Sequence, residues 1–214
     1  FGVVLAVAAV TVMGLAVNYV AAALLVLAIC FYVFVYTIWL KRRTPQNIVI
    51  GGASGAFPPM IGWAAVSGDV SLASLALFVI IFMWTPPHFW ALSLYRCGDY
   101  ARVGVPMMPV VAGARETRKL VLLYTAVLVP LTLAPFWLGV TGIAYASAAL
   151  VLGVIFLGLA LRLWVTATDA AAKAMLPLAE KTKGHGLKLG LYNHGGWGGE
   201  PANMVAVCQA LRKH

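Results

Sequence analysis

The chain has 214 residues, of which 63% are hydrophobic and only 10% are charged, and its mean hydropathy is +0.94. Soluble domains carry about 25% charged residues, so this composition excludes an ordinary water-soluble protein. The formal net charge of +9 resides in short basic clusters between apolar runs, which is typical of membrane-protein loops. We therefore predict an integral membrane protein that contacts membrane lipid and has no nucleic-acid partner.

Six apolar runs are near the roughly 20 residues that a bilayer-spanning helix needs. They cover residues 1–17, 19–40, 47–66, 72–95, 119–138 and 142–164. The predicted fold class is all-α, a polytopic transmembrane helical bundle of about six spanning helices. Because the chain opens at Phe1 inside an apolar run, we expect the bundle to be incomplete at its N-terminus.

The basic residues predict the orientation of the bundle. One loop holds Lys41, Arg42 and Arg43, and a polar stretch over residues 96–118 carries four arginines and is followed by Lys119, whereas Asp69 is the one charge in the intervening loops. Cytoplasmic loops carry an excess of Lys and Arg. We therefore expect a multi-pass protein of the cell inner membrane, with its basic loops and the residues after Trp164 in the cytoplasm.

Small residues and prolines interrupt the apolar spans. Gly51 and Gly55 are four residues apart, a spacing that lets another helix approach closely. Pro58-Pro59 and Pro86-Pro87 remove backbone donors in mid-span, so each pair is expected to kink its helix. Two kinks at similar depth would suggest a cavity.

Two segments carry candidate functional residues. The second span ends in Lys41, Arg42 and Arg43 and leads to Asn47, a set suited to an anion such as a diphosphate. On charge alone, however, the three cations are interpreted as a topology signal with side chains that extend to the membrane surface. The fourth span contains His88, a costly residue in a bilayer and hence a functional candidate or a hydrogen-bonded core histidine.

Asp99 follows the fourth span. If that helix persists past Gly98, then His88, Leu92, Tyr95 and Asp99 share one face, with His88 about 16 Å deeper than Asp99. On charge alone, Asp99 between Arg96 and Arg102 is interpreted as a surface ion pair. Residues 105–111, VPMMPVV, form an apolar stretch between basic clusters that we expect to enter the membrane interface.

Three segments together resemble a known family. YTIWLKRRTPQNIVIGGASGAFPPMIGW, IIFMWTPPHFWALSLYR and DYARVGVPMMPVVAG are similar to the protohaem IX farnesyltransferase (haem O synthase) branch of the UbiA superfamily of intramembrane prenyltransferases. The resemblance implies a helical bundle around a lipid-accessible cavity, with Mg²⁺ as cofactor and farnesyl diphosphate and haem B as substrates. It implies transfer of farnesyl to a haem vinyl group, and haem A synthase or terminal oxidase assembly proteins as partners.

The resemblance also implies roles for individual residues. Asp99 matches the second acid-rich motif, so the resemblance implies that it is a catalytic residue and a Mg²⁺ ligand. Lys41 is the second catalytic candidate. The diphosphate-binding candidates are Lys41, Arg42, Arg43, Asn47 and Arg96, and the haem-binding candidates are His88, Tyr36 and Trp90. Gly98 replaces an acid that relatives often have, and the first acid-rich motif is absent, so the remaining Mg²⁺ ligands are expected outside this chain.

Two other functions stay open, a prenyltransferase for a quinone precursor and a small membrane transporter. The predicted domains are a prenyltransferase bundle over residues 1–165, a linker over 166–177 and a soluble tail over 178–214. LKLGLYNHGGWGGEPANMVAVCQALRKH in the tail reads as a βα unit and resembles a fragment of a xylose-isomerase-like sugar isomerase barrel. His194 and Glu200 would be site residues in that context, but one βα unit cannot build a barrel site. We therefore expect the tail to be a fused fragment, and an ordinary cytoplasmic tail is the alternative.

Overall fold

The described part of the chain is helical from end to end. The computed structural model describes residues 1–184, with side chains as far as residue 165. Its elements are α1 (Gly2–Ala16), α2 (Tyr19–Cys30), the π-helix η1 (Phe31–Leu40), α3 (Asn47–Ser67), α4 (Leu72–Tyr95), α5 (Cys97–Arg102), α6 (Met108–Val111), α7 (Gly113–Leu131), α8 (Ala134–Trp137) and α9 (Ile143–Gly184). The predicted all-α class is confirmed for these residues.

Five segments of the described chain are long and apolar enough to cross a membrane. They are Tyr19–Leu40, Asn47–Ser67, Leu72–Tyr95, Gly113–Trp137 and Ile143–Val165. The expected first span, α1, has 15 residues, fewer than the roughly 17 that a helical span needs. The chain is thus a multi-pass membrane protein with five full-length spans in its described part and one shorter apolar helix.

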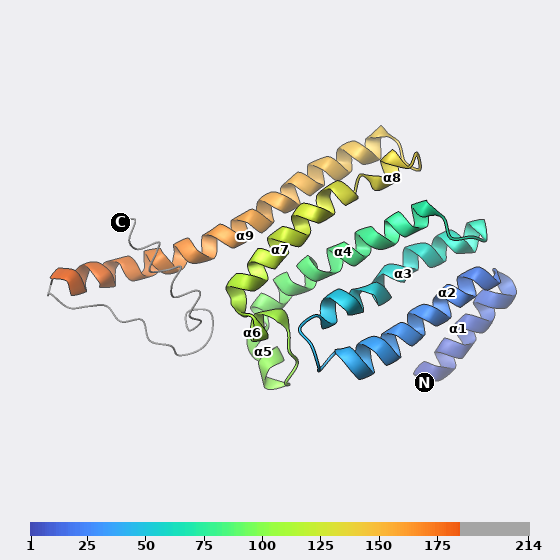
Figure 1. Cartoon of the computed structure of the whole chain (residues 1–214), viewed down its shortest axis with the longest axis horizontal. Helices are drawn as coiled ribbons and strands as arrows, with labels where there is room; N and C mark the ends of the chain where they lie inside the picture. Colours follow the sequence, from blue (N-terminus) through green and yellow to red (C-terminus); the bar gives the residue numbers. More distant parts are fainter. Residues whose placement is uncertain (185–214) are drawn as a thin grey trace.

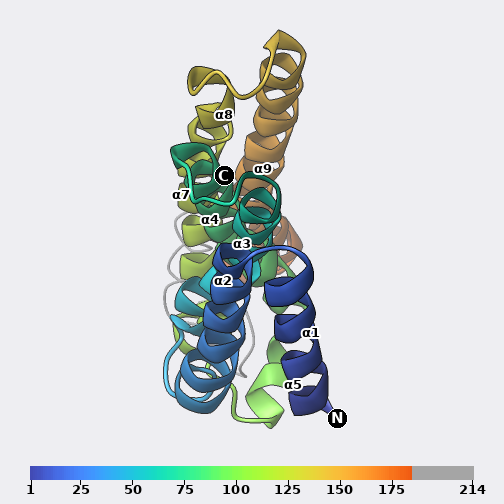
Figure 2. The same ribbon diagram turned by 90° about the vertical axis from the view of Figure 1, so that its right-hand side faces the viewer.

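The helices lie side by side in chain order (Figure 1). The main contacts join α1 to α2, α2 to α3, α3 to α4, α4 to α7, and α7 to α9. The basic turn at 41–46, α5, α6 and the start of α7 lie at one end, and the turns after α1, α3 and α8 lie toward the other. Figure 2 shows the N-terminus at the same end as α5.

Glycines allow two of the helix contacts near the basic end. A methyl group at Gly51 would overlap the ring of Tyr36, so the π-helix packs directly on the backbone of α3. Gly52 lies against Thr85 of α4 in the same way. At Gly55, no atom of the described residues lies within 4 Å of the place a methyl group would take, so the described part of the chain shows no close helix contact there.

Both proline pairs lie inside continuous helices, Pro58-Pro59 in α3 and Pro86-Pro87 in α4. Just before the second pair, the Thr85 hydroxyl donates to the Ile81 carbonyl at 2.8 Å. Two apolar grooves have volumes of about 270 and 310 Å³, one between α1 and α2 and one between the start of α4 and the α7–α8 region. None of these prolines lines either groove, so the cavity expected at the kinks stays a prediction.

The polar stretch over residues 96–118 is not the long loop that the sequence predicted. Helix α4 ends at Tyr95, α5 and α6 follow, and α7 begins already at Gly113. Gly113 has a φ of +83°, a conformation that residues with a side chain rarely adopt, and Glu116 lies in the favourable first turn of α7. Arg115, Arg118 and Lys119 therefore lie on a helix.

The C-terminal part of the chain also bears on the predicted organisation. Helix α9 continues without interruption through residues 166–177, the predicted linker, and ends at Gly184. The predicted βα unit, with His194 and Glu200, lies outside the described residues.

A hydrophobic cluster forms the core near the basic end. It contains Ile48 of α3, Trp90 of α4, Met107, Met108, Val121 of α7 and Ala160 of α9. Met107 and Met108 are only 2% and 4% exposed. The VPMMPVV segment therefore packs into the core of the bundle, and its entry into the membrane interface stays a prediction.

Candidate functional site

The basic turn between η1 and α3 is closed by its own backbone. The amides of Arg43 and Thr44 donate to the Leu40 carbonyl, and the Asn47 amide donates to the Thr44 carbonyl at 3.2 Å. The Thr44 hydroxyl accepts from the Gln46 amide at 3.2 Å. Leu40 is 5% exposed and anchors the start of the turn in the bundle.

The three cations on this turn face outward. Lys41, Arg42 and Arg43 are all exposed. The structure therefore presents three positive side chains on a folded turn rather than on a loose loop. Such a turn is suited to an anion that approaches from the membrane surface, because the cations are close together before the anion arrives.

Asn47 differs from its basic neighbours because its side chain is turned inward. The residue is 1% exposed, and its Nδ2 group donates to the Lys41 carbonyl at 3.1 Å. Its Oδ1 atom is buried without a hydrogen-bond partner among the described residues. Of the diphosphate-binding candidates in this turn, Asn47 alone is enclosed.

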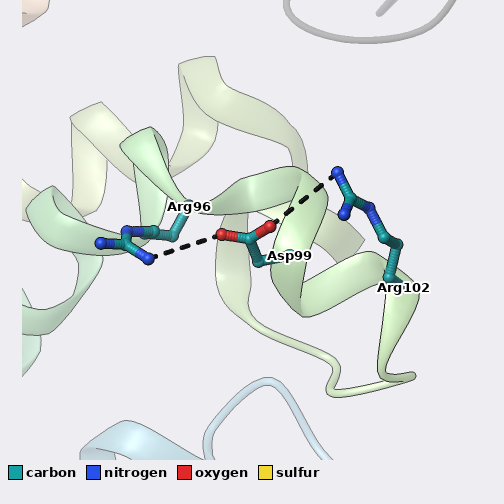
Figure 3. Close-up of polar contacts among 3 residues, drawn as sticks. All are labelled: Arg96, Asp99 and Arg102. Carbon is teal, nitrogen blue, oxygen red and sulfur yellow. Dashed lines mark ion pairs between the residues drawn. The ribbon is translucent and has the colours of Figure 1, made fainter.

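Asp99 lies on the exposed side of α5 between two arginines (Figure 3). Its carboxylate oxygens are 3.7 Å from Arg96 and 3.9 Å from Arg102, and the three side chains are 57–82% exposed. Ion pairs this open to solvent contribute little to stability. His88 and Asp99 were expected to share a face only if the helix persists past Gly98, and this condition is not met, because α4 ends at Tyr95 and α5 begins after Arg96.

The hydrophobic core brings the basic turn and α5 to one place. Ile48, the residue after Asn47, belongs to the core cluster, and Tyr100, the residue after Asp99, packs against that cluster. Neither Ile48 nor Tyr100 is among the predicted site residues, and their positions next to Asn47 and Asp99 are the one signal in the sequence that could have indicated them.

The three haem-binding candidates occupy different environments. His88 is exposed and stacks on Trp84, with ring centroids 4.2 Å apart. Trp90 is 1% exposed and meets Tyr124 edge to face, because positions two apart on a helix point in nearly opposite directions. Tyr36 packs on Gly51. The structure thus places His88 and Trp90 on opposite faces of α4.

The described residues do not by themselves form a Mg²⁺ site. No group of three or more His, Cys, Asp or Glu side chains gathers anywhere in the described part. Near the basic turn, Asp99 is paired with two arginines, and Glu116 of α7 is paired with Lys119 at 3.6 Å. Mg²⁺ usually takes one or two carboxylates together with phosphate oxygens and water, and the arginines compete for the one carboxylate offered on α5.

These features define an intramembrane helical protein with a cationic surface at one end of its bundle. Comparison with known proteins shows the family: the chain belongs to the UbiA prenyltransferase family, which it matches over residues 1–180. The match extends through the range that we predicted as a linker.

Individual relatives carry a more specific name. The chain is 62% identical over 179 residues to the protoheme IX farnesyltransferase of Parvibaculum lavamentivorans. The aligned region covers 82% of this chain and 56% of the relative. The protein of that name from Azorhizobium caulinodans is 61% identical, over 80% of this chain and 56% of its own length. The one from Novosphingobium aromaticivorans is 59% identical, over 76% of this chain and 53% of its own length. The chain spans about half the length of these relatives. No solved structure gives a significant match.

Proposed function

We propose that this chain forms part of an intramembrane prenyltransferase that transfers farnesyl from farnesyl diphosphate to haem B, giving haem O. The observation that carries the proposal is the fixed turn of three exposed cations, packed on the same core cluster as α5. Family membership and the names of the relatives support this reaction. A quinone-precursor prenyltransferase and a transporter are not favoured by any relative described above.

The cations would act on the leaving group. As the bond between the allylic carbon and oxygen breaks, negative charge grows on the diphosphate, and positive side chains aimed at it lower the barrier. Lys41, Arg42, Arg43 and Arg96 are exposed at this end and supply that charge. The allylic cation then takes the electron pair of a haem vinyl group, and water adds to the resulting cation with loss of a proton.

His88 is our candidate haem contact. It is an exposed imidazole within a membrane span, stacked on Trp84, and a polar group facing lipid is costly unless something covers it. A flat aromatic substrate would satisfy this face by stacking. Trp90 would contribute only indirectly, by packing against Tyr124. Tyr36, on the backbone of α3, is the third haem candidate.

The protein's environment follows from the same proposal. We infer that the basic end faces the cytoplasm and that the membrane is the cell inner membrane, because membrane proteins keep Lys and Arg on the cytoplasmic side. Haem A synthase or terminal oxidase assembly proteins would receive the product. Mg²⁺ would require carboxylates beyond those described in this chain.

The deciding experiment supplies haem B and farnesyl diphosphate to membranes that contain the chain together with the half of a relative that it does not span. Mass spectrometry of extracted pigment should then detect haem O in the presence of Mg²⁺. The chain alone should give none, because Asp99 is its one Mg²⁺ candidate among the described residues and is already paired with Arg96 and Arg102. Absence of haem O from the combined halves, under conditions in which a full-length relative makes it, would contradict the proposal.

Two variants separate the proposed substrate contacts. Lys41→Ala should weaken farnesyl diphosphate binding more than haem binding. His88→Ala should shift the Soret band of bound haem and leave diphosphate binding unchanged. Equal weakening of both substrates by Lys41→Ala would place the turn outside the diphosphate site, and an unchanged haem spectrum would exclude His88 as a contact.

A further inference from the structure

Two contacts attach the π-helix η1 and the basic turn that follows it to α3. The Tyr36 ring lies on Gly51, and the Lys41 carbonyl accepts the Asn47 side-chain amide at 3.1 Å. Lys41 is the first residue after η1, and its own amide donates back five residues to Tyr36 at 2.9 Å. The backbone at the first cation is therefore held by the hydrogen bond from Asn47.

Asn47 is placed to orient the turn rather than to touch an anion. Its residue is 1% exposed, whereas Lys41, Arg42 and Arg43 are exposed. One of the two Nδ2 N–H donors is engaged with the Lys41 carbonyl, and the Oδ1 atom, an acceptor, is enclosed without a partner among the described residues. An acceptor oxygen offers an anion no favourable hydrogen bond.

We propose that Asn47 is a positioning residue that holds the Lys41–Arg43 turn in its anion-binding form through the Lys41 carbonyl. This inference rests on the proposed function, since it takes the anion to be a diphosphate. A binding surface that is ordered before its ligand arrives loses less conformational freedom on binding. Asn47 would thus raise diphosphate affinity without contacting the ligand.

Asn47→Leu isolates the hydrogen bond from packing. Leucine has nearly the same size and shape as asparagine but lacks the donor, and it replaces an oxygen that has no partner, so folding should be maintained. Asn18→Leu is the matched control. Asn18 donates to the Ala64 carbonyl at 2.8 Å near the other end of the same helix, far from the basic turn.

The measurements use the 214-residue chain in nanodiscs of phosphatidylcholine, with inorganic pyrophosphate as the probe. Calorimetry should show a pyrophosphate Kd that rises by about tenfold in Asn47→Leu and stays within twofold in Asn18→Leu. Without ligand, trypsin should cut after residues 41–43 faster in Asn47→Leu than in the wild type. The unfolding temperature should fall more in Asn18→Leu than in Asn47→Leu, the opposite of the order expected for the pyrophosphate Kd.

Each contrary result has its own meaning. An unchanged Kd in Asn47→Leu, with or without faster cleavage, overturns the positioning role and leaves the proposed function standing. An equal rise in Kd for both variants also overturns it, because general destabilisation would then explain the effect. No pyrophosphate binding by the wild-type chain, or no effect of Lys41→Ala, refutes the diphosphate site itself and the inference with it.

Discussion

Two asparagine side chains connect the two ends of α3 to neighbouring segments by hydrogen bonds to backbone carbonyls. Asn47 binds the turn before α3, and Asn18 binds the Ala64 and Ala65 carbonyls at 2.8 and 3.2 Å near the end of α3. Asn18 also caps α2, because its Oδ1 accepts from the Ala21 amide at 2.8 Å. The sequence marks Asn18 as a break between two apolar runs, and the structure adds its contact with a helix 46 residues away.

Asn18→Ala should destabilise the protein more than the loss of an ordinary helix cap. It removes a cap worth about 1 kcal/mol and two hydrogen bonds worth about 1 kcal/mol each, for a total of about 2–3 kcal/mol. Ser71→Ala is the control, because Ser71 caps α4 through the Ser74 amide alone. Thermal unfolding in detergent should rank wild type above Ser71→Ala and Ser71→Ala above Asn18→Ala, and equal effects would show that the contacts with α3 contribute nothing.

At the scale of the element, the π-helix η1 is the main feature absent from the predictions. The sequence predicts one span over 19–40, whereas the structure divides it into α2 and η1. The Thr37 hydroxyl donates to the Tyr32 carbonyl at 2.9 Å, five residues back. π-Helical turns are rare and are often found at functional sites, and this one leads directly into the basic turn.

Gly51 and Gly55 offer a direct test of how η1 packs on α3. Gly51→Ala should destabilise the protein by about 1–3 kcal/mol, because the added methyl group would overlap the Tyr36 ring. Gly55→Ala should be neutral or stabilising by up to about 1 kcal/mol, because the space there is open and alanine is the better helix former. Chemical unfolding would measure both, and a tolerated Gly51→Ala would show that Tyr36 does not depend on this contact.

At the scale of the whole molecule, the spans carry their cations to one end. The turn at 41–46 and the segment from α5 to the start of α7 lie together, and the turn that contains Asp69 lies away from them (Figure 1). This arrangement agrees with the orientation expected from the sequence, because consecutive antiparallel spans return alternate loops to the same side. Sidedness relative to the cytoplasm remains a prediction.

Cysteine labelling can test that sidedness. In a variant with Cys30, Cys97 and Cys208 replaced by serine, Asp69→Cys in spheroplasts should react with a membrane-impermeant maleimide. Arg42→Cys should react only after the membrane is opened, because the inner membrane separates it from the reagent. Labelling of Arg42→Cys in intact spheroplasts would invert the proposed orientation.

The sequence by itself determined the class of protein, the approximate spans and the end at which the cations gather. These properties depend on composition and on runs of apolar residues, which act locally: five of the six expected spans are present, and Leu72–Tyr95 has the predicted bounds. The family motifs also identified the turn at 41–47 and Asp99 as the places to examine, although their roles remain proposals.

Tertiary structure alone decided which candidate side chains are buried and which are exposed. Asn47 and Trp90 are buried while His88 and Asp99 are exposed, and burial depends on neighbours that are distant in the chain. Trp90 packs on Tyr124 of α7, and the contact between Tyr36 and Gly51 joins two segments across the basic turn. Apolar patterning in a membrane protein does not reveal which face meets lipid and which meets protein, since both favour the same residues. Helix packing makes that choice, and here it leaves the cations outward and the asparagine that orients them inward.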